Sequence, residues 1–191
     1  MSPDWPLETD RLRLRPFVEA DFPEFAAMQA DPALARWLYE EARVGAAARA
    51  HFERKLAGRA LEREDDWMSC AVVERATGAL AGDVSLHWVS REHRTGEIGF
   101  IFASGHHGKG YATEAAHALV DWAFRADFHR VIGRTEARNA ASARVLEKLG
   151  MRREALFVEN EWVKGEWQSE LVYAILAREW SDYRSERRIP V

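Results

Sequence analysis

The chain has 191 residues, 47% of them hydrophobic and 30% charged, so it is long enough to bury a core and too apolar for a disordered protein. Its net charge of −4 argues against a nucleic-acid partner, which needs a strongly basic surface. With no long apolar run or leader pattern, a cytoplasmic protein without a membrane partner is expected. The single cysteine, Cys70, excludes an internal disulfide and suits a reducing compartment.

The first third of the chain favours one strand followed by helices. Leu12–Phe17 alternates apolar residues with arginine, which is typical of a half-buried strand. Asp21–Gln29 carries apolar residues at helical spacing, and Ala33–Arg43 and Val44–Arg63 are rich in good helix formers. We therefore predict helices in these segments, ending before Asp65.

Three strands are predicted next. Trp67–Glu74 and Leu80–Trp88 flank a Thr77-Gly78 turn signal and form a hairpin, and Gly96–Phe102 is a third apolar strand. A glycine-rich loop then leads into a helix. The helix is predicted over Tyr111–Asp127.

The last third alternates strands with one further helix. Arg130–Glu136 predicts a strand, and Asn139 is a good N-cap for a helix over Ala140–Leu149. Two more strands follow, Arg152–Val163 and Trp167–Leu176. The elements predict a single domain over residues 1–191, of the mixed α/β (α+β) class, with about seven strands and four to five helices. The first few residues and the tail after about residue 180 are expected to be peripheral.

The loop His107-Gly108-Lys109-Gly110-Tyr111-Ala112 lies between a strand and a helix. The first turn of a helix has backbone N–H groups without partners and a dipole that favours anions, and glycine lets a ligand approach the backbone closely. The loop therefore predicts a pyrophosphate site. It matches neither the phosphate-binding Walker loop nor the G-x-G-x-x-G dinucleotide motif, because Gly110 and Thr113 stand where those patterns need other residues. A glycine turn that merely opens a helix is the alternative.

No metal site is expected. His106 and His107 are neighbours without further cysteine or histidine ligands at the spacing that metal sites use. Ordinary loop histidines explain the pair.

A second motif narrows the ligand of the loop. The run NAASARVLEKLGM (139–151) starts a helix directly after a strand, as GKGYATEA (108–115) does. Together with Leu7–Pro16 and the ending from Gly165 to Trp180, these runs resemble the GCN5-related N-acetyltransferase (GNAT) superfamily, in particular its RimJ/RimL-like branch, which acetylates ribosomal-protein N-termini. The resemblance covers nearly the whole chain. It implies a mostly antiparallel sheet, splayed where coenzyme A binds.

The resemblance also implies which residues bind acetyl-CoA or another short acyl-CoA. Backbone amides of the glycine loop would hold the pyrophosphate, and the strand ending at Ala103 would lie along the pantetheine arm. His107 stands where the family pattern has Gln or Arg. The residues assigned to the cofactor are Ile101, Phe102, Ala103, His107, Gly108, Lys109, Gly110, Tyr111, Ala112, Thr113, Asn139 and Ser142.

Catalytic roles follow from the same resemblance and from the chemistry of amine attack on a thioester, which needs a base and an acid. Many relatives protonate the thiolate with a tyrosine seven residues after the asparagine, but Leu146 stands there. Ser142, three residues after Asn139, is the hydroxyl that the branch uses. Glu97 is the candidate base, with Asp83 and His87 as rivals on the neighbouring strand.

The acceptor cannot be derived from the sequence. The resemblance implies an amine, either a peptide or protein N-terminus or a small molecule, and it allows a homodimer. Trp37 and Tyr39 fall where relatives build the acceptor pocket, although aromatic side chains more often fill cores. The alternative to an acyltransferase is a non-catalytic module that binds coenzyme A for sensing or assembly, and the missing tyrosine at position 146 keeps it open.

Overall fold

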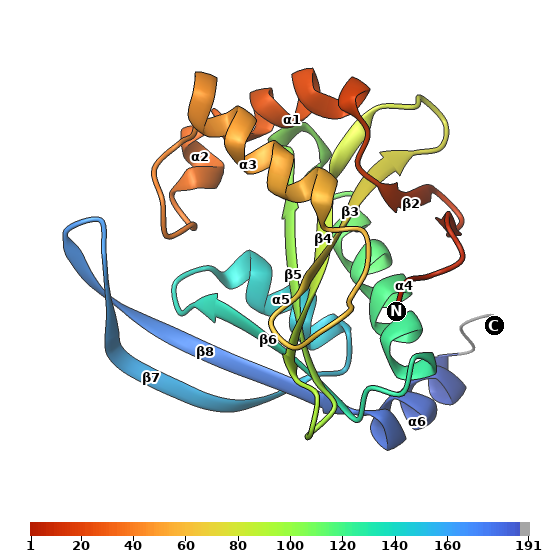
Figure 1. Cartoon of the computed structure of the whole chain (residues 1–191). Helices are drawn as coiled ribbons and strands as arrows, with labels where there is room; N and C mark the ends of the chain where they lie inside the picture. The colour runs from red at the N-terminus through yellow and green to blue at the C-terminus, as the bar shows by residue number, and fades with distance from the viewer. Residues whose placement is uncertain (188–191) are drawn as a thin grey trace.

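A computed structural model describes residues 1–187 of the chain (Figure 1). Residues 188–191, part of the tail that was expected to be peripheral, lie outside the described residues. The helices are α1 (Phe22–Gln29), α2 (Pro32–Ala35), α3 (Gly45–Ala57), α4 (Tyr111–Arg125), α5 (Ala140–Lys148) and α6 (Ala177–Arg187). The strands are β1 (Leu7–Glu8), β2 (Leu12–Pro16), β3 (Trp67–Glu74), β4 (Leu80–Ser90), β5 (Thr95–Phe102), β6 (Arg130–Glu136), β7 (Arg152–Val163) and β8 (Glu166–Leu176).

The strands form one sheet in the order β1-β2-β3-β4-β5-β6-β8-β7. All neighbours are antiparallel except β5 and β6. The predicted α/β class and the mostly antiparallel sheet are confirmed. The described part has eight strands and six α-helices, one strand and one helix more than the sequence patterns indicated. The added strand is the two-residue β1, and the added helix is α6.

The segment predicted as a helix over 33–43 is helical only in α2. Pro32 starts it and the Asp31 carboxylate caps it at the Ala33 N–H. The chain then folds back on α1, because both the backbone N–H and the guanidinium of Arg43 bind Gln29. Such a tertiary contact overrides helix propensity.

Helix α3 is also shorter than the predicted helix over 44–63. It ends at Gly58, whose carbonyl accepts the N–H of Ser69 in β3 at 2.7 Å. A Cβ at Gly58 would lie 2.7 Å from the Trp67 carbonyl oxygen, so the close approach of two backbones ends the helix there.

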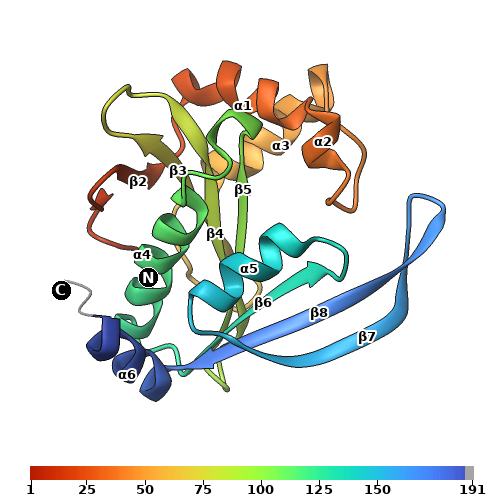
Figure 2. The ribbon, with the colours of Figure 1, turned by 180° about the vertical axis from the view of Figure 1, so that it is seen from behind.

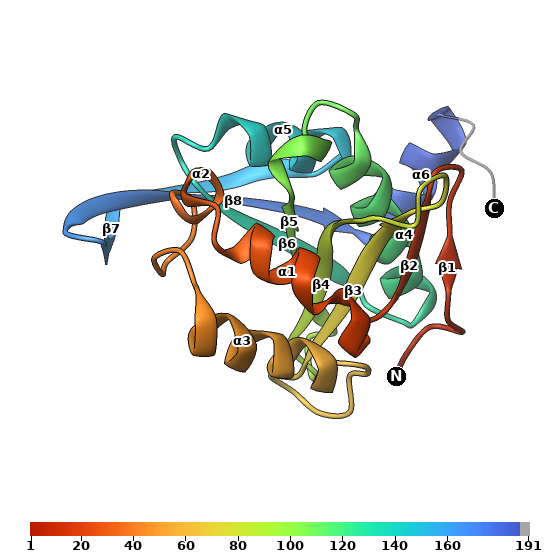
Figure 3. The same cartoon turned by 90° about the horizontal axis from the view of Figure 1, so that it is seen from above.

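Helices cover both faces of the sheet (Figure 3). Helices α4 and α5 pack on β4, β5, β6 and β8, and α1 and α3 pack on the opposite face over β3 and β4. The larger core lies under α4 and includes Leu119, Leu86 and Ile98. The smaller core, built around Phe17, Phe25 and Phe52, lies under α1 and α3.

Strands β5 and β6 are paired only over three residues of each strand. Thr95–Glu97 matches Arg130–Ile132, and beyond this point β5 follows β4 while β6 follows β8. The two strands therefore diverge toward their C-terminal ends (Figure 2). This is the splay that the resemblance implied, and it opens the sheet between the two helical layers.

Both described ends of the chain contact the domain. The Met1 carbonyl accepts the N–H of Leu61 at 2.8 Å. At the other end Trp180 is buried, its indole N–H donates to Asp121 at 3.1 Å, and Tyr183 stacks on it with ring centroids 5.4 Å apart. None of the helices in the described chain has both the length and the apolar character needed to span a bilayer.

Candidate active site

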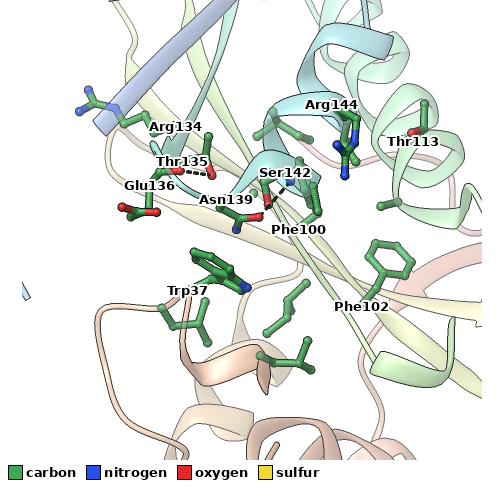
Figure 4. Close-up of a pocket in the computed structure, with 18 of the residues that line it drawn as sticks. Trp37, Phe100, Phe102, Thr113, Arg134, Thr135, Glu136, Asn139, Ser142 and Arg144 are labelled. Carbon is green, nitrogen blue, oxygen red and sulfur yellow. Dashed lines mark hydrogen bonds between the residues drawn. The ribbon is translucent and has the colours of Figure 1, made fainter. Parts of the chain in front are cut away.

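A cavity of about 820 Å³ lies where β5 and β6 diverge. Figure 4 shows that residues from α2 and its following loop, β5, β6, α4 and α5 face it. All the residues predicted for cofactor binding and catalysis line it except Ala103. Apart from Ala103, the predicted residues, which are drawn from separate segments, therefore line one cavity.

The backbone N–H and C=O groups of β5 point alternately toward β4 and toward the gap that opens between β5 and β6. The Ala103 N–H donates to the Ala81 carbonyl at 3.0 Å, so Ile101, two residues earlier, also directs its N–H and C=O to β4. Phe100 and Phe102 therefore turn these groups toward the gap. The prediction of a backbone contact fits Phe102. The backbone of Ile101 and the Ala103 N–H are used by the sheet, and the Ala103 carbonyl accepts the His106 N–H at 2.8 Å.

The glycine loop adopts the conformation that its sequence requires. Gly108 and Gly110 have φ values of +75° and +80°, in the left-handed region that favours glycine. Glu114 is the first residue of α4 whose N–H bonds back, to the Gly110 carbonyl at 3.1 Å. The N–H groups of Tyr111, Ala112 and Thr113 thus have no acceptor in the helix, and they line the cavity.

Three contacts fix this loop to the rest of the sheet. The Arg11 guanidinium donates to the Lys109 carbonyl at 2.8 Å and pairs with Glu114. The Tyr111 hydroxyl donates to Glu74 of β3. The ring of His107 contacts the Phe102 carbonyl oxygen through Nε2 at 2.7 Å. Because Phe102 turns this carbonyl into the gap, His107 closes one end of it.

Cationic side chains gather at this end of the cavity. Lys109 of the loop and Arg144 and Lys148 of α5 all line it, and Figure 4 shows Arg144 on the same side of the cavity as Thr113. Their positive charge adds to the positive end of the α4 dipole. This end is therefore suited to an anionic ligand such as a pyrophosphate.

Asn139 and Ser142 lie together at the start of α5. The buried Asn139 accepts the Ser142 N–H through Oδ1 at 3.2 Å, which caps the helix. This leaves the Ser142 side chain at the cavity wall (Figure 4). Leu146 does not line the cavity, since its side chain is 1% exposed and belongs to the core.

The other end of the cavity is acidic. Arg134 of β6 stands between two glutamates, with Nε 3.4 Å from Glu97 Oε2 and Nη1 3.3 Å from Glu170 Oε1. Burial raises the pKa of Glu97, which Arg134 and His87 lower in part. Burial also raises the pKa of Glu170; Arg134 lowers this pKa in part, and repulsion from Glu161 and Glu97 adds to the rise. Desolvated carboxylates of this kind favour a cationic ligand.

Aromatic residues cover the acidic end. Trp37 lies across the cavity from Asn139 and Ser142 (Figure 4). The Tyr39 hydroxyl donates to Glu161 of β7 at 3.1 Å, and Trp67 completes this side of the lining. The loop after α2 thus meets the β7–β8 hairpin above the acidic end of the cavity.

The two rivals of Glu97 do not line the cavity. Asp83 is buried and paired with Lys55 of α3 at 2.8 Å. His87 stacks on Trp67, with ring centroids 4.4 Å apart, and its Nε2 lies 3.4 Å from Asp65. Cys70 is a buried free thiol whose pKa is raised by burial. Among the described residues, no three His, Cys, Asp or Glu side chains come together as a metal site.

Arg134, Glu161 and Glu170 also line the cavity but were not predicted from the sequence. A signal was present, because Glu170 directly precedes the apolar run Leu171–Leu176 of β8 and Arg134 directly follows an apolar stretch of β6. Charged residues at such positions are rare without a partner or a role. The pairing of β6 with β8, which brings them together, could not be inferred without the topology.

Comparison with known proteins gives one consistent result. The model of the acetyltransferase (GNAT) domain family matches residues 11–152. The N-acetyltransferase YnaD of Bacillus subtilis (strain 168) is 39% identical over 111 residues, which are 58% of this chain and 65% of YnaD. The chain thus matches slightly less than two thirds of this relative's length.

Solved structures share the fold along nearly the whole chain. The crystal structure of a GNAT-family acetyltransferase from Bacillus anthracis is 28% identical, with a TM-score of 0.82 over 91% of this chain and 99% of that one. The spermidine N-acetyltransferase of Vibrio cholerae, solved with CoA and spermine, has a TM-score of 0.76 at 20% identity, over 91% of this chain and 99% of that one. At that identity the second likeness shows the fold alone.

Proposed function

The chain belongs to the GNAT acetyltransferase family, and from this premise we propose that it transfers an acetyl group from acetyl-CoA directly to a primary amine. One observation carries the proposal. A single cavity has a cationic end, with a glycine-opened helix N-terminus, and an acidic end, and Asn139 and Ser142 line its wall. A pyrophosphate-bearing donor and a cationic acceptor fit the two ends.

Acetyl-CoA, when bound, supplies the activated thioester. The N–H groups of Tyr111, Ala112 and Thr113 would hold its pyrophosphate, assisted by Lys109 and Arg144. The backbone of Phe100 and Phe102 would pair with its amide-bearing arm, as an added strand does. A side chain at Gly108 would meet no atom of the protein within 4 Å, so the space beside the loop is open to a ligand.

Transfer needs a base for the ammonium proton and an acid for the departing sulfur. Glu97 is the carboxylate at the acidic end that would take the proton, directly or through a water. The Ser142 hydroxyl would donate to the thiolate as the carbon–sulfur bond breaks and the carbon–nitrogen bond forms. Both groups line the same cavity, so no covalent enzyme intermediate is needed.

The acceptor would be an amine that is cationic in water. Glu97, Glu161 and Glu170 support this class, since they outnumber Arg134, the basic residue beside them. A peptide or protein N-terminus, as in the RimJ/RimL-like branch, and a small amine, as in the spermidine enzyme, both satisfy it. A homodimer and the preference for acetyl over another short acyl group stay predictions.

A non-catalytic module that binds coenzyme A is the second candidate. The burial of Leu146 favours it, because this side chain replaces the acid that many relatives use and has no access to the cavity. The position of Ser142 favours catalysis, since a hydroxyl lines the cavity one helical turn away.

A melting experiment with a matched control tests donor binding. At about 100 times Kd, acetyl-CoA should raise the melting temperature by roughly 5 to 10 °C. Gly110→Asp places a carboxylate beside the pyrophosphate and should abolish the shift. Gly78→Asp is the control, because Gly78 has a similar φ of +77° with open space in a hairpin turn, and it should keep the shift. If both variants lose the rise in melting temperature, or if both keep it, the assignment of the glycine loop to the pyrophosphate is contradicted.

A further inference from the structure

Arg134 makes weak contacts for a partly buried ion pair. It reaches each carboxylate with one nitrogen, at 3.4 Å to Glu97 and 3.3 Å to Glu170. Arg15 of the same chain, by comparison, binds Asp21 through two nitrogens at 2.7 Å each. Short bidentate contacts are the strong ones. The guanidinium of Arg134 is therefore bound only weakly by Glu97 and Glu170, although it is the positive charge between these two carboxylates.

The side chain of Arg134 is more exposed to solvent than those of the two glutamates that it contacts. The Arg134 side chain is 46% exposed, whereas Glu97 is 21% and Glu170 only 4% exposed. The guanidinium can move into solvent, because nearly half of the Arg134 side chain is already exposed and a long stem lets its charged head reach water. The two carboxylates are fixed on β5 and β8. The cation can leave, and the anions cannot.

The three side chains lie where the acceptor would bind, so the difference in exposure bears on acceptor binding. Glu97, Arg134 and Glu170 all line the cavity that would receive the acceptor. Ile132, Arg134 and Glu136 lie on the same face of β6, because side chains alternate along a strand. Glu97 of β5 is in register with Ile132, and Glu170 of β8 is in register with Glu136. Glu97, Arg134 and Glu170 therefore share the face of the sheet that α1 and α3 cover. A cation that enters between the carboxylates must replace the guanidinium.

We propose that Arg134 is a tethered cation that occupies the acceptor's place between Glu97 and Glu170 and is displaced by an acceptor with two ammonium groups. The inference rests on the proposed function and adds the substrate class, a diamine. One amino group lies at Glu97, which takes its proton, and the second lies at Glu170. A monoamine brings one ammonium group and pairs with one of the two carboxylates, whereas Arg134 contacts both, so a monoamine competes less well with Arg134.

A different role for Arg134 makes the opposite prediction. A guanidinium that binds a carboxylate of the acceptor would hold an anionic or zwitterionic amine. Removal of the Arg134 guanidinium would then weaken acceptor binding. The sign of the change in affinity separates the two roles.

The test measures binding of 1,4-diaminobutane and of butylamine by calorimetry, with CoA present and no acetyl donor. Arg134→Gln is compared with the wild type at about pH 8, well above the ordinary range of carboxyl groups. We expect the diamine to bind roughly three- to fivefold more tightly to the variant and butylamine to change less. Arg130→Gln is the matched control, because Arg130 lies on the same strand and pairs with Glu154 outside the cavity. The Arg130→Gln variant should bind both amines with the affinity of the wild type.

A second variant keeps the result decisive. Adding Glu170→Gln to Arg134→Gln should return the diamine affinity to the wild-type value or below, because the site for the second ammonium is gone. Unchanged or weaker diamine binding in Arg134→Gln would overturn the proposal, as would an equal gain for butylamine. Since no acetyl group is transferred, these results are independent of whether the protein is a catalyst.

Discussion

Leu146 of α5 packs directly on Gly133 of β6. A Cβ at Gly133 would lie 2.4 Å from Leu146 Cδ2 and 3.4 Å from Ile98 Cγ2. The absence of a side chain in the strand thus makes room for the leucine, which becomes part of the core. Position 146 is a packing position in this chain, which leaves Ser142 as the hydroxyl of α5 that lines the cavity.

The Gly133–Leu146 contact predicts a coupled effect on stability. Gly133→Ala should lower the free energy of unfolding by about 1 to 3 kcal/mol through overpacking, and Leu146→Ala by about 2 to 5 kcal/mol through a cavity. The double variant should lose less than the sum, because the new methyl fills part of the space. Urea unfolding of the four proteins measures the coupling. Additive losses would contradict the contact.

Leu146→Tyr should not create a better enzyme. The larger side chain has no room over Gly133, so we expect a lower melting temperature and no gain in kcat. A rise in kcat in this variant, with stability retained, would show that position 146 has access to the reacting sulfur.

Ser142→Ala tests the assignment of the acid. Loss of the hydroxyl should lower kcat roughly a hundredfold, with acetyl-CoA binding retained, because the cap uses the Ser142 N–H and not its side chain. Ser90→Ala is the control, as its hydroxyl accepts the His93 N–H at a turn outside the cavity. Equal rates for the two variants would remove Ser142 from the mechanism.

Glu97 predicts the acidic side of the pH profile. A base must be ionised, and burial raises the pKa of Glu97 while Arg134 of β6 and His87 of β4 lower it in part. The value of kcat/KM should therefore fall, as pH decreases, at a pH above the ordinary range of carboxyl groups. Glu97→Gln should abolish this fall together with most of the activity. Arg134→Gln should move the fall to higher pH, and an unchanged profile would exclude Glu97 as the base.

His51 predicts a loss of stability in mild acid. The ring of this α3 residue packs on Phe25, and burial, with Lys55, Arg43 and Arg54 nearby, lowers its pKa from 6.5 to about 3. Below pH 6.5 the unfolded chain then binds a proton that the folded chain does not, so stability falls as pH decreases. His51→Gln should flatten this dependence between pH 6.5 and 5, as measured by urea unfolding. The same slope in both proteins would contradict the shift.

Local patterns were enough to predict most strands and both helices that form the donor site. The bounds of β6 and of β3 are those predicted, because an apolar run between turn residues specifies a strand without tertiary information. Gly108, Gly110 and Asn139 were identified for the same reason, since a positive φ and a helix cap are local requirements.

Non-local contacts explain what the sequence did not reveal. Helix α2 stops early because Arg43 returns to Gln29, and the acidic end exists because β8 pairs with β6 after a long crossover. The direction of the β5 backbone, which turns Phe100 and Phe102 and not Ile101 into the gap, depends on the register with β4. None of these can be inferred from a segment alone.

The most direct test of the proposed reaction is a count of both products of one incubation. The protein is mixed with acetyl-CoA and a panel of primary amines that includes 1,4-diaminobutane and peptides with a free N-terminus, and free thiol and N-acetylated amine are measured together. We predict thiol and N-acetyl product in equal amounts with at least one acceptor, and both formed roughly a hundredfold more slowly in Ser142→Ala. Acetyl-CoA binding in the melting experiment without thiol release from any acceptor would contradict catalysis and leave a CoA-binding module.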